Sequence, residues 1–375
     1  MVPETSPAEI PVLRPRLPTA DDVLPYLRRI DETRVYSNHG PLTLEFEERA
    51  ALELSLPRAS FVSAASGTAA LTGAILASAG RASPQRPLAI IPAFTFVATV
   101  CAVEQCGYVP HFVDVDAATW SLDAVALARA PVVERAGIVV PVAPFGRPQP
   151  QQDWREFQNR TALPVVIDGA ASFDTARGPE FLGEIPIAMS FNATKAFATG
   201  EGGAVIANDA DFTVRVRRAL NFGFFRTRES RFASLNGKMS EYHAAVGLAE
   251  LDMWALKRKT LEEVVSRYRR AAADEALSES IVTAPEVSLS YVLFRARDRD
   301  EAERVQDALR AESIATRRWY GFGVHREPYY QNVEHGDLAV TEAIAARLLG
   351  IPMAPDLSDE NVGRIIRTIR SARSA

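Results

Sequence analysis

The residues that could carry chemistry in this sequence lie at the ends of short apolar runs near its middle. Asp168 directly follows the run at residues 164–167, and Lys195 follows the run at residues 185–191. Short apolar runs are typical of buried strands, so both side chains are expected where strands end. A lysine amine can bond covalently to an aldehyde, and a carboxylate can keep a nearby ring nitrogen protonated. This pair therefore indicates chemistry on a cofactor that has both an aldehyde and a ring nitrogen.

An aspartate and a lysine placed in this way meet the needs of a pyridoxal phosphate enzyme of the aspartate aminotransferase type. The lysine would form the Schiff base with the cofactor, and the carboxylate would let the ring accept electrons from a carbanion. Backbone N–H groups and hydroxyls at Gly67, Thr68 and Ser190 are candidates for the phosphate, and Phe96 could stack on the ring. Each residue also has an ordinary structural explanation as a strand end, a cap or a helix start.

Composition and charge limit the classes of protein to which the chain can belong. Its 375 residues exceed one typical domain, so two domains are expected. A net charge of -5 disfavours a nucleic-acid binder, because phosphate backbones are bound by clustered Lys and Arg. Two cysteines and five scattered histidines indicate no metal site and no disulfide framework. Free thiols favour a reducing, cytoplasmic compartment.

The pattern along the chain predicts three segments. Residues 1–20 form a Pro-rich arm for which poor order is expected, and they lack the features of a signal peptide. A large domain is expected over residues 21–254 and a smaller α+β domain over residues 255–375. No apolar run reaches the roughly 18 residues of a membrane span, so no membrane partner is expected.

Strand and helix patterns alternate through the first 210 residues. Because the strand patterns are almost continuously apolar, they predict a mostly parallel sheet covered by helices on both faces. A long helical region is expected at residues 239–276, with a break near residue 253. The C-terminal part is expected to contain strands and helices in this order: strand 289–296, helix 299–311, strand 313–318, helix 338–349 and helix 359–371.

Longer motifs resemble the DegT/StrS family of pyridoxal phosphate sugar aminotransferases, which have fold type I. The matching pieces occur in the family's order through almost the full length: YSNHGPLTLEFE, SGTAAL, PAFTFVATVCAVEQCGYVPHFVDVD, VVIDGAA, SFNATKAFATGEGGAV, LNGKMSEYHAAVGLAEL, IATRRWY and RLLGIPMAPDLSDENV. The lysine block and the LNGKMSEYHAAVGL segment are the specific ones. The resemblance implies a large three-layer α/β/α domain around a mostly parallel mixed sheet, and a smaller α+β C-terminal domain.

The resemblance also implies roles for the residues around the cofactor. Lys195 would be the Schiff-base lysine and later the base that transfers a proton, and Asp168 would be the partner of the pyridine nitrogen. Phe96 would stack on the ring. The implied phosphate contacts are Gly67, Thr68 and Ser190.

Other residues are implied at a second subunit and at the substrate. Asn236 looks like the residue that family members donate to the cofactor phosphate of the neighbouring subunit, which implies a homodimer with shared active sites. Lys238 stands where many members have Arg, and would be a cation near substrate or cofactor anions. Candidates for contact with the substrate are Arg318, Tyr320 and His325, and His325 has an alternative interpretation as an ordinary loop residue. Four arginines are candidates for contact with a sugar diphosphate, since the fork of a guanidinium matches phosphate oxygens: Arg226, Arg228, Arg317 and Arg318. For two of these four, an ordinary solvated position on the surface is an equal alternative.

Two positions bear on the reaction. Many family members have Gln or His three residues after the aspartate, near the phenolic oxygen of the cofactor, whereas this chain has Ala171. Asn192, another group or water could cover that oxygen instead. The dehydratase branch of the family has His in place of the lysine, so the presence of Lys195 favours transamination.

The resemblance implies an aminotransferase that moves an amino group from a donor such as glutamate to a nucleotide-linked keto-sugar. Similarity of SFNATK and LNGKMSE to members with 4-amino products favours a 4-keto over a 3-keto substrate. The product would be an amino sugar for a surface polysaccharide or a secondary metabolite. Ala171 leaves open a free keto-sugar, a sugar acid or a cyclitol ketone as substrate. A non-catalytic regulatory paralogue is the other alternative.

Overall fold

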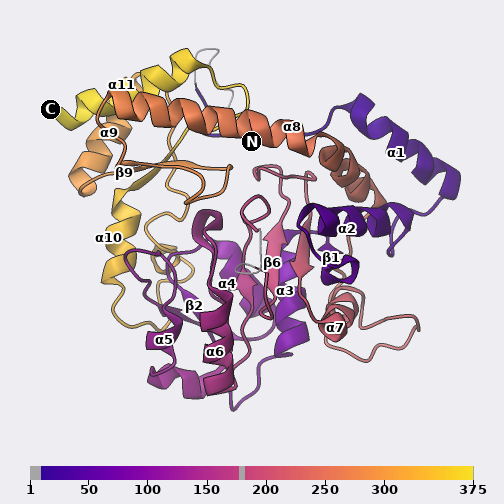
Figure 1. Ribbon diagram of the computed structural model, residues 1–375. Coiled ribbons are helices and arrows are strands. Elements are labelled where there is room, and N and C mark those ends of the chain that lie inside the picture. Colours follow the sequence, from indigo (N-terminus) through magenta and orange to yellow (C-terminus); the bar gives the residue numbers. More distant parts are fainter. Residues whose placement is uncertain (1–9, 177–181, 375) are drawn as a thin grey trace.

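The computed structural model describes residues 10–176 and 182–374, and its first helices come before any strand (Figure 1). These are α1 (Ala20–Thr33) and α2 (Pro41–Glu53). The hydroxyl of Thr19 accepts a hydrogen bond from Asp22 N, and the Asp22 carboxylate accepts one from Thr19 N. This reciprocal capping explains why α1 begins at its acidic residue pair.

Seven strands follow in the large part of the molecule: β1 (Phe61–Ala64), β2 (Leu88–Pro92), β3 (Val109–Val113), β4 (Ala136–Val139), β5 (Ile167–Asp168), β6 (Ile187–Ser190) and β7 (Gly203–Ile206). Isolated parallel bridges, Val139 to Val165 and Val142 to Asp168, join β4 to β5. The strand order is therefore β3-β2-β4-β5-β6-β7-β1. β7 is antiparallel to both neighbours, and the other pairings among the described strands are parallel.

Helices cover this sheet on both faces. One core contains Ala89 and Ile91 of β2 together with α3 (Gly67–Ser78), α4 (Val97–Gln105) and α7 (Ala210–Leu220). The alternate residues Leu88 and Ile90 belong to another core, with α2, α6 (Gln151–Thr161) and α8 (Glu241–Asp274). The predicted three-layer α/β/α arrangement around a mostly parallel sheet is confirmed. Shorter helical segments are α5 (Ala124–Leu127) and the 3-10 turns Arg58–Ser60, Pro131–Arg135, Pro144–Gly146 and Val324–Arg326.

The C-terminal part has a small antiparallel sheet of β8 (Ile281–Val282), β9 (Val292–Arg295) and β10 (Leu348–Ile351). Its helices are α9 (Arg299–Ala311), α10 (Ala339–Arg347) and α11 (Asp359–Ser374). The expected helix 338–349 is wrong at its end, because residues 348–351 pair with β9 and bury their apolar side chains there. The expected strand 313–318 contributes only isolated bridges, from Ile314 to Ile10 and from Arg317 to Gly350.

Helix α8 runs unbroken for 34 residues, so the break expected near residue 253 is wrong. Trp254 is buried in the core, which keeps that turn of the helix in place. Asp252 accepts a hydrogen bond from Tyr26 of α1, whereas Tyr268 donates one to Pro352 O in the C-terminal part. We propose that the two domains, 21–254 and 255–375, meet along this helix. No helix in the described ranges is both long and apolar enough to cross a membrane.

The N-terminal arm is partly described. Residues 1–9 lie outside the described residues. Ile10 N donates to Ser313 O at 2.9 Å, and Met353 N donates to Val12 O at 2.9 Å. The expectation of poor order is therefore wrong for this part of the arm, because its backbone pairs with the C-terminal domain.

Candidate active site

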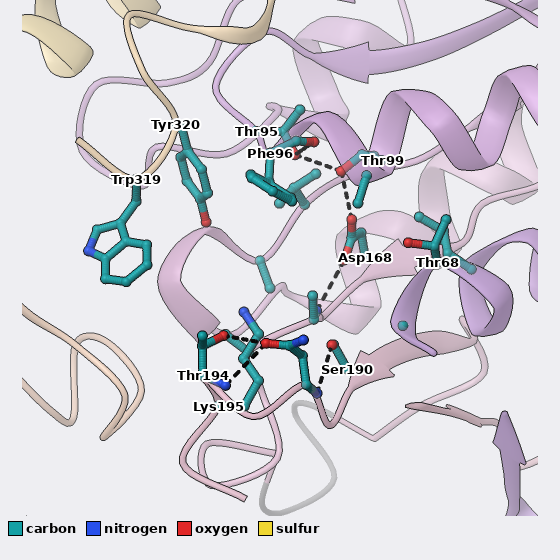
Figure 2. Close-up of a pocket in the computed structure, with 18 of the residues that line it drawn as sticks. Thr68, Thr95, Phe96, Thr99, Asp168, Ser190, Thr194, Lys195, Trp319 and Tyr320 are labelled. Carbon is teal, nitrogen blue, oxygen red and sulfur yellow. Dashed lines mark hydrogen bonds between the residues drawn. The ribbon is translucent and has the colours of Figure 1, made fainter. Parts of the chain in front are cut away.

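A cavity of about 400 Å³ lies where β4, β5 and β6 end, which is where ligands bind in open α/β sheets. The first residues of α3 and α4 line it too. Figure 2 shows Asp168 and Lys195 at this cavity, with Trp319 and Tyr320 on the side away from Thr68. The cavity is thus built from both parts of the chain.

Eleven residues have an expected role in catalysis or in binding the cofactor or substrate, and seven of them line the cavity: Gly67, Thr68, Phe96, Asp168, Ser190, Lys195 and Tyr320. The remaining four do not line this cavity: Asn236, Lys238, Arg318 and His325. Of the further arginines considered for a diphosphate, Arg317 lines the cavity, whereas Arg226 and Arg228 do not. The seven come from segments more than 250 residues apart, from Gly67 to Tyr320, so only the fold places them side by side.

Asp168 is a buried carboxylate at the end of β5, with 7% of its surface exposed. Thr99 Oγ1 donates to Oδ2 at 2.7 Å, and Ala170 N donates to Oδ1 at 3.1 Å. Burial raises the pKa of Asp168, while these two donors and the charge of Lys195 oppose that rise. A cation that bound opposite the carboxylate would favour its ionised form. The site therefore suits a protonated ring nitrogen.

Lys195 lies in the loop that follows β6, and hydrogen bonds on either side of the lysine hold this loop. Asn192 Oδ1 accepts hydrogen bonds from Thr194 N at 3.1 Å and Thr194 Oγ1 at 2.8 Å. On the other side, Ala196 N donates to Ser290 Oγ at 2.8 Å. The lysine amine therefore projects from a backbone that is fixed on both sides.

The N-terminus of α3 forms a cradle for an anion. Ser66 caps the helix by accepting from Ala69 N, and in the described part of the chain the N–H groups of Gly67 and Thr68 have no acceptor. A Cβ atom at Gly67 would lie 2.6 Å from Ser190 Cβ, so only glycine lets the helix approach the Ser190 hydroxyl this closely. Free N–H groups at a helix N-terminus beside a hydroxyl suit a phosphate.

Aromatic rings border the cavity on more than one side. Phe96 precedes α4 and leaves 53% of its surface exposed, although it is a large apolar residue. Tyr320 comes from the C-terminal part, and its hydroxyl accepts a hydrogen bond from Phe145 N at 3.1 Å. Burial raises the pKa of Tyr320, so it stays a neutral phenol. An exposed ring at the edge of the cavity can stack on a flat ligand.

Asn236 and Lys238 lie together outside the cavity. Asn236 is exposed, and the backbone pairs it with Asn221. Lys238 Nζ donates to Asn236 Oδ1 at 2.6 Å and lies 4.3 Å from the centroid of the Phe222 ring. Neither residue lines the cavity of its own chain. The role of Asn236 at a neighbouring subunit and that of Lys238 as a cation near substrate or cofactor anions stay predictions.

Arg318 and His325 have structural partners, which corrects their assignment as substrate contacts. Arg318 Nη1 donates to the carbonyls of Ala345 at 2.9 Å and Ala346 at 2.7 Å, near the end of α10. A guanidinium there satisfies carbonyls that the helix leaves unpaired. His325 is 5% exposed, and its Nε2 lies 3.2 Å from Glu342 Oε1. Both side chains therefore stabilise the C-terminal domain.

Ala171 lines the cavity, as does Asn192, the candidate for covering the phenolic oxygen in place of the usual Gln or His. Asn192 Nδ2 donates to Glu201 Oε1 at 2.7 Å, while its oxygen accepts from Thr194. The amide is thus engaged within its own loop. Asn192 consequently does not stand in for the missing Gln or His.

The residues of the cavity that sequence reasoning missed include Thr99, Tyr291 and Trp319. Thr99 follows Phe96 by three positions on one helical face, so helical periodicity could have identified it. No sequence pattern identifies Tyr291, because it is 96 residues from Lys195, whose amine it contacts. Only the tertiary structure reveals it.

The donor set fits pyridoxal phosphate. A carboxylate, an amine, free backbone N–H groups and an exposed aromatic ring surround one cavity, at Asp168, Lys195, Gly67–Thr68 and Phe96. These groups match the ring nitrogen, the aldehyde, the phosphate and the ring face of that cofactor.

Comparisons with known proteins agree with this assignment. The profile of the DegT/DnrJ/EryC1/StrS aminotransferase family matches residues 19–370. The chain is 34% identical to protein Rv3402c of Mycobacterium tuberculosis, over 97% of this chain and 90% of that protein. It is 28% identical to dTDP-4-amino-4,6-dideoxy-D-glucose transaminase of Shigella dysenteriae, over 96% and 98% of the two chains. The solved structure of DesI in the presence of its TDP-sugar product has a TM-score of 0.84 and 31% identity, with 98% of this chain and 94% of that chain covered.

The family match covers nearly the whole chain, and the named relatives include sugar transaminases. The similarity to DesI extends through the large and small parts of the fold, which confirms the predicted fold class. The expected enzyme class and cofactor are confirmed as well: this protein is an aminotransferase that uses pyridoxal phosphate. The chain belongs to the DegT/DnrJ/EryC1/StrS aminotransferase family.

Proposed function

We propose that the protein transfers an amino group from an amino acid such as glutamate to the keto group of a nucleotide-linked sugar, at the 4-position. The observation that carries this proposal is the single cavity that presents both Asp168 and Lys195 beneath a rim from the C-terminal part. Support for the substrate class comes from the Shigella relative, named for a dTDP-linked 4-amino sugar, and from DesI with its TDP-sugar product.

Five residues of the cavity have a part in this reaction. When bound, pyridoxal phosphate supplies a ring that accepts electrons from a carbanion. Asp168 holds the proton on the ring nitrogen, because a buried carboxylate favours the cation opposite it. Lys195 moves a proton at the reacting carbon as the general base. The N–H groups of Gly67 and Thr68 bind the phosphate, and Phe96 covers the ring.

The rim provides candidates for the sugar nucleotide. Arg317 lines the cavity, and its guanidinium lies 4.9 Å from the centroid of the Trp319 ring. It has no carboxylate partner in the described ranges, so it can bind diphosphate oxygens. Tyr320 borders the same space and helps to exclude water. Arg318 and His325 have no part in this proposal, since both side chains are engaged within the C-terminal domain.

A homodimer with shared sites is part of the proposal. Asn236 is exposed and does not line the cavity of its own chain, which fits a role at a second cavity, as the family resemblance implies. Tyr36 and Tyr242 each leave about half of their surface exposed, and their rings lie 6.3 Å apart. Exposed aromatic pairs of this kind suit a protein interface. Residence in the cytoplasm and a role in polysaccharide synthesis remain predictions.

The test compares ketone substrates under the same conditions. Purified enzyme with glutamate is expected to aminate a dTDP-linked 4-keto-6-deoxy sugar with a kcat/KM at least about 100-fold higher than that for the free keto-sugar or a cyclitol ketone. Equal rates, or a preference for the free ketone, would support the alternative substrates. Absence of any amination in a protein that retains its cofactor would instead support a regulatory paralogue.

A further inference from the structure

The amine of Lys195 contacts a side chain that the proposed reaction does not use. Lys195 Nζ donates to the hydroxyl of Tyr291 at 3.1 Å, and Nζ lies 5.8 Å from the centroid of the same ring. Tyr291 lines the cavity but exposes only 6% of its surface. The position of the amine is therefore restricted by a buried hydroxyl as well as by the backbone of the loop that carries Lys195.

The ring of Tyr291 is itself fixed by its packing. Its centroid lies 5.3 Å from that of Phe145 and 5.2 Å from that of Trp319, and both pairs meet edge to face. A tyrosine side chain has only two rotatable bonds, and neighbours on two sides restrict both of them. The position of its hydroxyl is thus set by the core of the protein.

The segment before Tyr291 joins this side chain to the lysine loop. Ser290 Oγ accepts from Ala196 N, the residue after Lys195, at 2.8 Å. Ser288 Oγ and Leu289 N each donate to the buried carboxylate of Asp174 at 2.7 Å. These hydrogen bonds and the chain itself join three parts: the Tyr291 hydroxyl, the loop that carries Lys195 and the segment that follows Asp168. We call these three parts the frame.

A tyrosine suits this position for a chemical reason. Its hydroxyl accepts a hydrogen bond from a charged ammonium and donates one to a neutral amine. The proton of this hydroxyl has no other acceptor within the ranges that the structure describes. The contact therefore survives when Lys195 gains or loses its proton, which a contact with a second cation would not do.

We propose that Tyr291 is a positioning residue for Lys195. Its hydroxyl holds the amine at one point of the cavity whenever the amine is not bonded to the cofactor, so that the amine can return to the same place. This role applies in both halves of the reaction, because the amine is free of the cofactor during part of each half. It goes beyond the proposed substrate, and it would hold for an enzyme that acts on any ketone.

The test measures how fast cofactor-free protein captures pyridoxal phosphate, followed as the rise in absorbance when the lysine bond forms. Tyr291→Phe keeps the ring and removes the hydroxyl, so capture is expected to slow about tenfold, because a misplaced reacting group loses rate steeply. Inhibition of capture by inorganic phosphate should be unchanged, since the N-terminus of α3 is untouched. Reaction with α-deuterated glutamate should show a larger isotope effect than in wild type, because proton transfer by Lys195 becomes slower.

The matched control is Tyr268→Phe, which removes another buried hydroxyl, one that donates to Pro352 O at 2.6 Å. This variant should capture the cofactor within about twofold of the wild-type rate. The proposal is overturned if Tyr291→Phe is as fast as this control, or if Tyr291→Phe loses phosphate inhibition in parallel with its rate. Should Tyr291→Phe fail to fold, Ser290→Ala loosens the same frame: slower capture supports the proposal, and an unchanged rate overturns it.

Discussion

The floor and the rim of the cavity differ in how they hold their residues. On the floor, Asp168 and Lys195 follow parallel strands, and the strand ends bring them to one edge of the sheet. On the rim, some side chains of residues 317–325 line the cavity, and others pack within the C-terminal domain. In a sheet, the position of a residue after its strand is enough to predict that it lies at the site. In a loop, only the tertiary contacts decide which side chains lie there.

The arginine pair on the rim shows why. Arg317 pairs with Gly350 in a bridge, so the backbone there is extended and successive side chains point to opposite sides. Arg317 consequently lines the cavity, while Arg318 bonds to the last carbonyls of α10. Two identical neighbouring residues thus have different roles.

The largest effect is expected on the floor. Lys195→Ala should lower amino transfer by about 10³-fold or more, because it removes both the covalent bond to the cofactor and the general base. The measurement is the single-turnover rate with glutamate. Lys259→Ala, at an exposed position of α8, is the control and should keep the wild-type rate. A comparable loss of single-turnover rate in both variants would contradict the catalytic role of Lys195.

A smaller effect is expected where α3 meets β6. Gly67→Ala would place a methyl group 2.6 Å from Ser190 Cβ and push the helix N-terminus away, so the affinity for pyridoxal phosphate should fall about tenfold. Equilibrium binding to cofactor-free protein measures it. The control is Gly336→Ala, because a Cβ atom there would meet no atom within 4 Å. Equal affinities of the two variants would contradict the phosphate cradle.

The rim should respond unequally to matched changes. Arg317→Met is expected to raise the KM for a nucleotide sugar about fivefold, because a guanidinium at the cavity is lost. Arg318→Met should leave that KM within about twofold and lower the free energy of unfolding by roughly 1–2 kcal/mol, since two carbonyls lose their donor. Steady-state kinetics and denaturant unfolding separate the two outcomes. The reverse pattern would show that Arg318, and not Arg317, faces the cavity.

The smallest effect concerns the pH dependence of stability. Burial raises the pKa of Asp168 above its ordinary value of 3.8, so the folded protein binds this proton more tightly than the unfolded chain does. Cofactor-free wild type should therefore lose stability relative to Asp168→Asn as the pH rises above about 4. Unfolding of both proteins in denaturant at pH 4 to 8 tests this. A difference in free energy that stays constant with pH would contradict the buried ionisation.

Much of the fold and the floor could be predicted because both rest on local patterns. Apolar runs identify strands, and the Ser-Gly-Thr turn identifies the start of α3. The rest depends on long-range packing. Leu348 and Leu349 fit a helical pattern, yet they form a strand because β9 offers a partner. Tyr291 reaches Lys195 across 96 residues, and no spacing rule contains that contact.

The central claim is that Lys195, at the end of β6, is the lysine that bonds to the cofactor. Borohydride reduction of the holoenzyme, followed by peptide mass spectrometry, tests it directly, because the sequence offers only a few lysines: Lys195, Lys238, Lys257 and Lys259. We predict that the reduced pyridoxyl group is found on Lys195. A label on another lysine, or no label in protein that binds the cofactor, would contradict this account of the site.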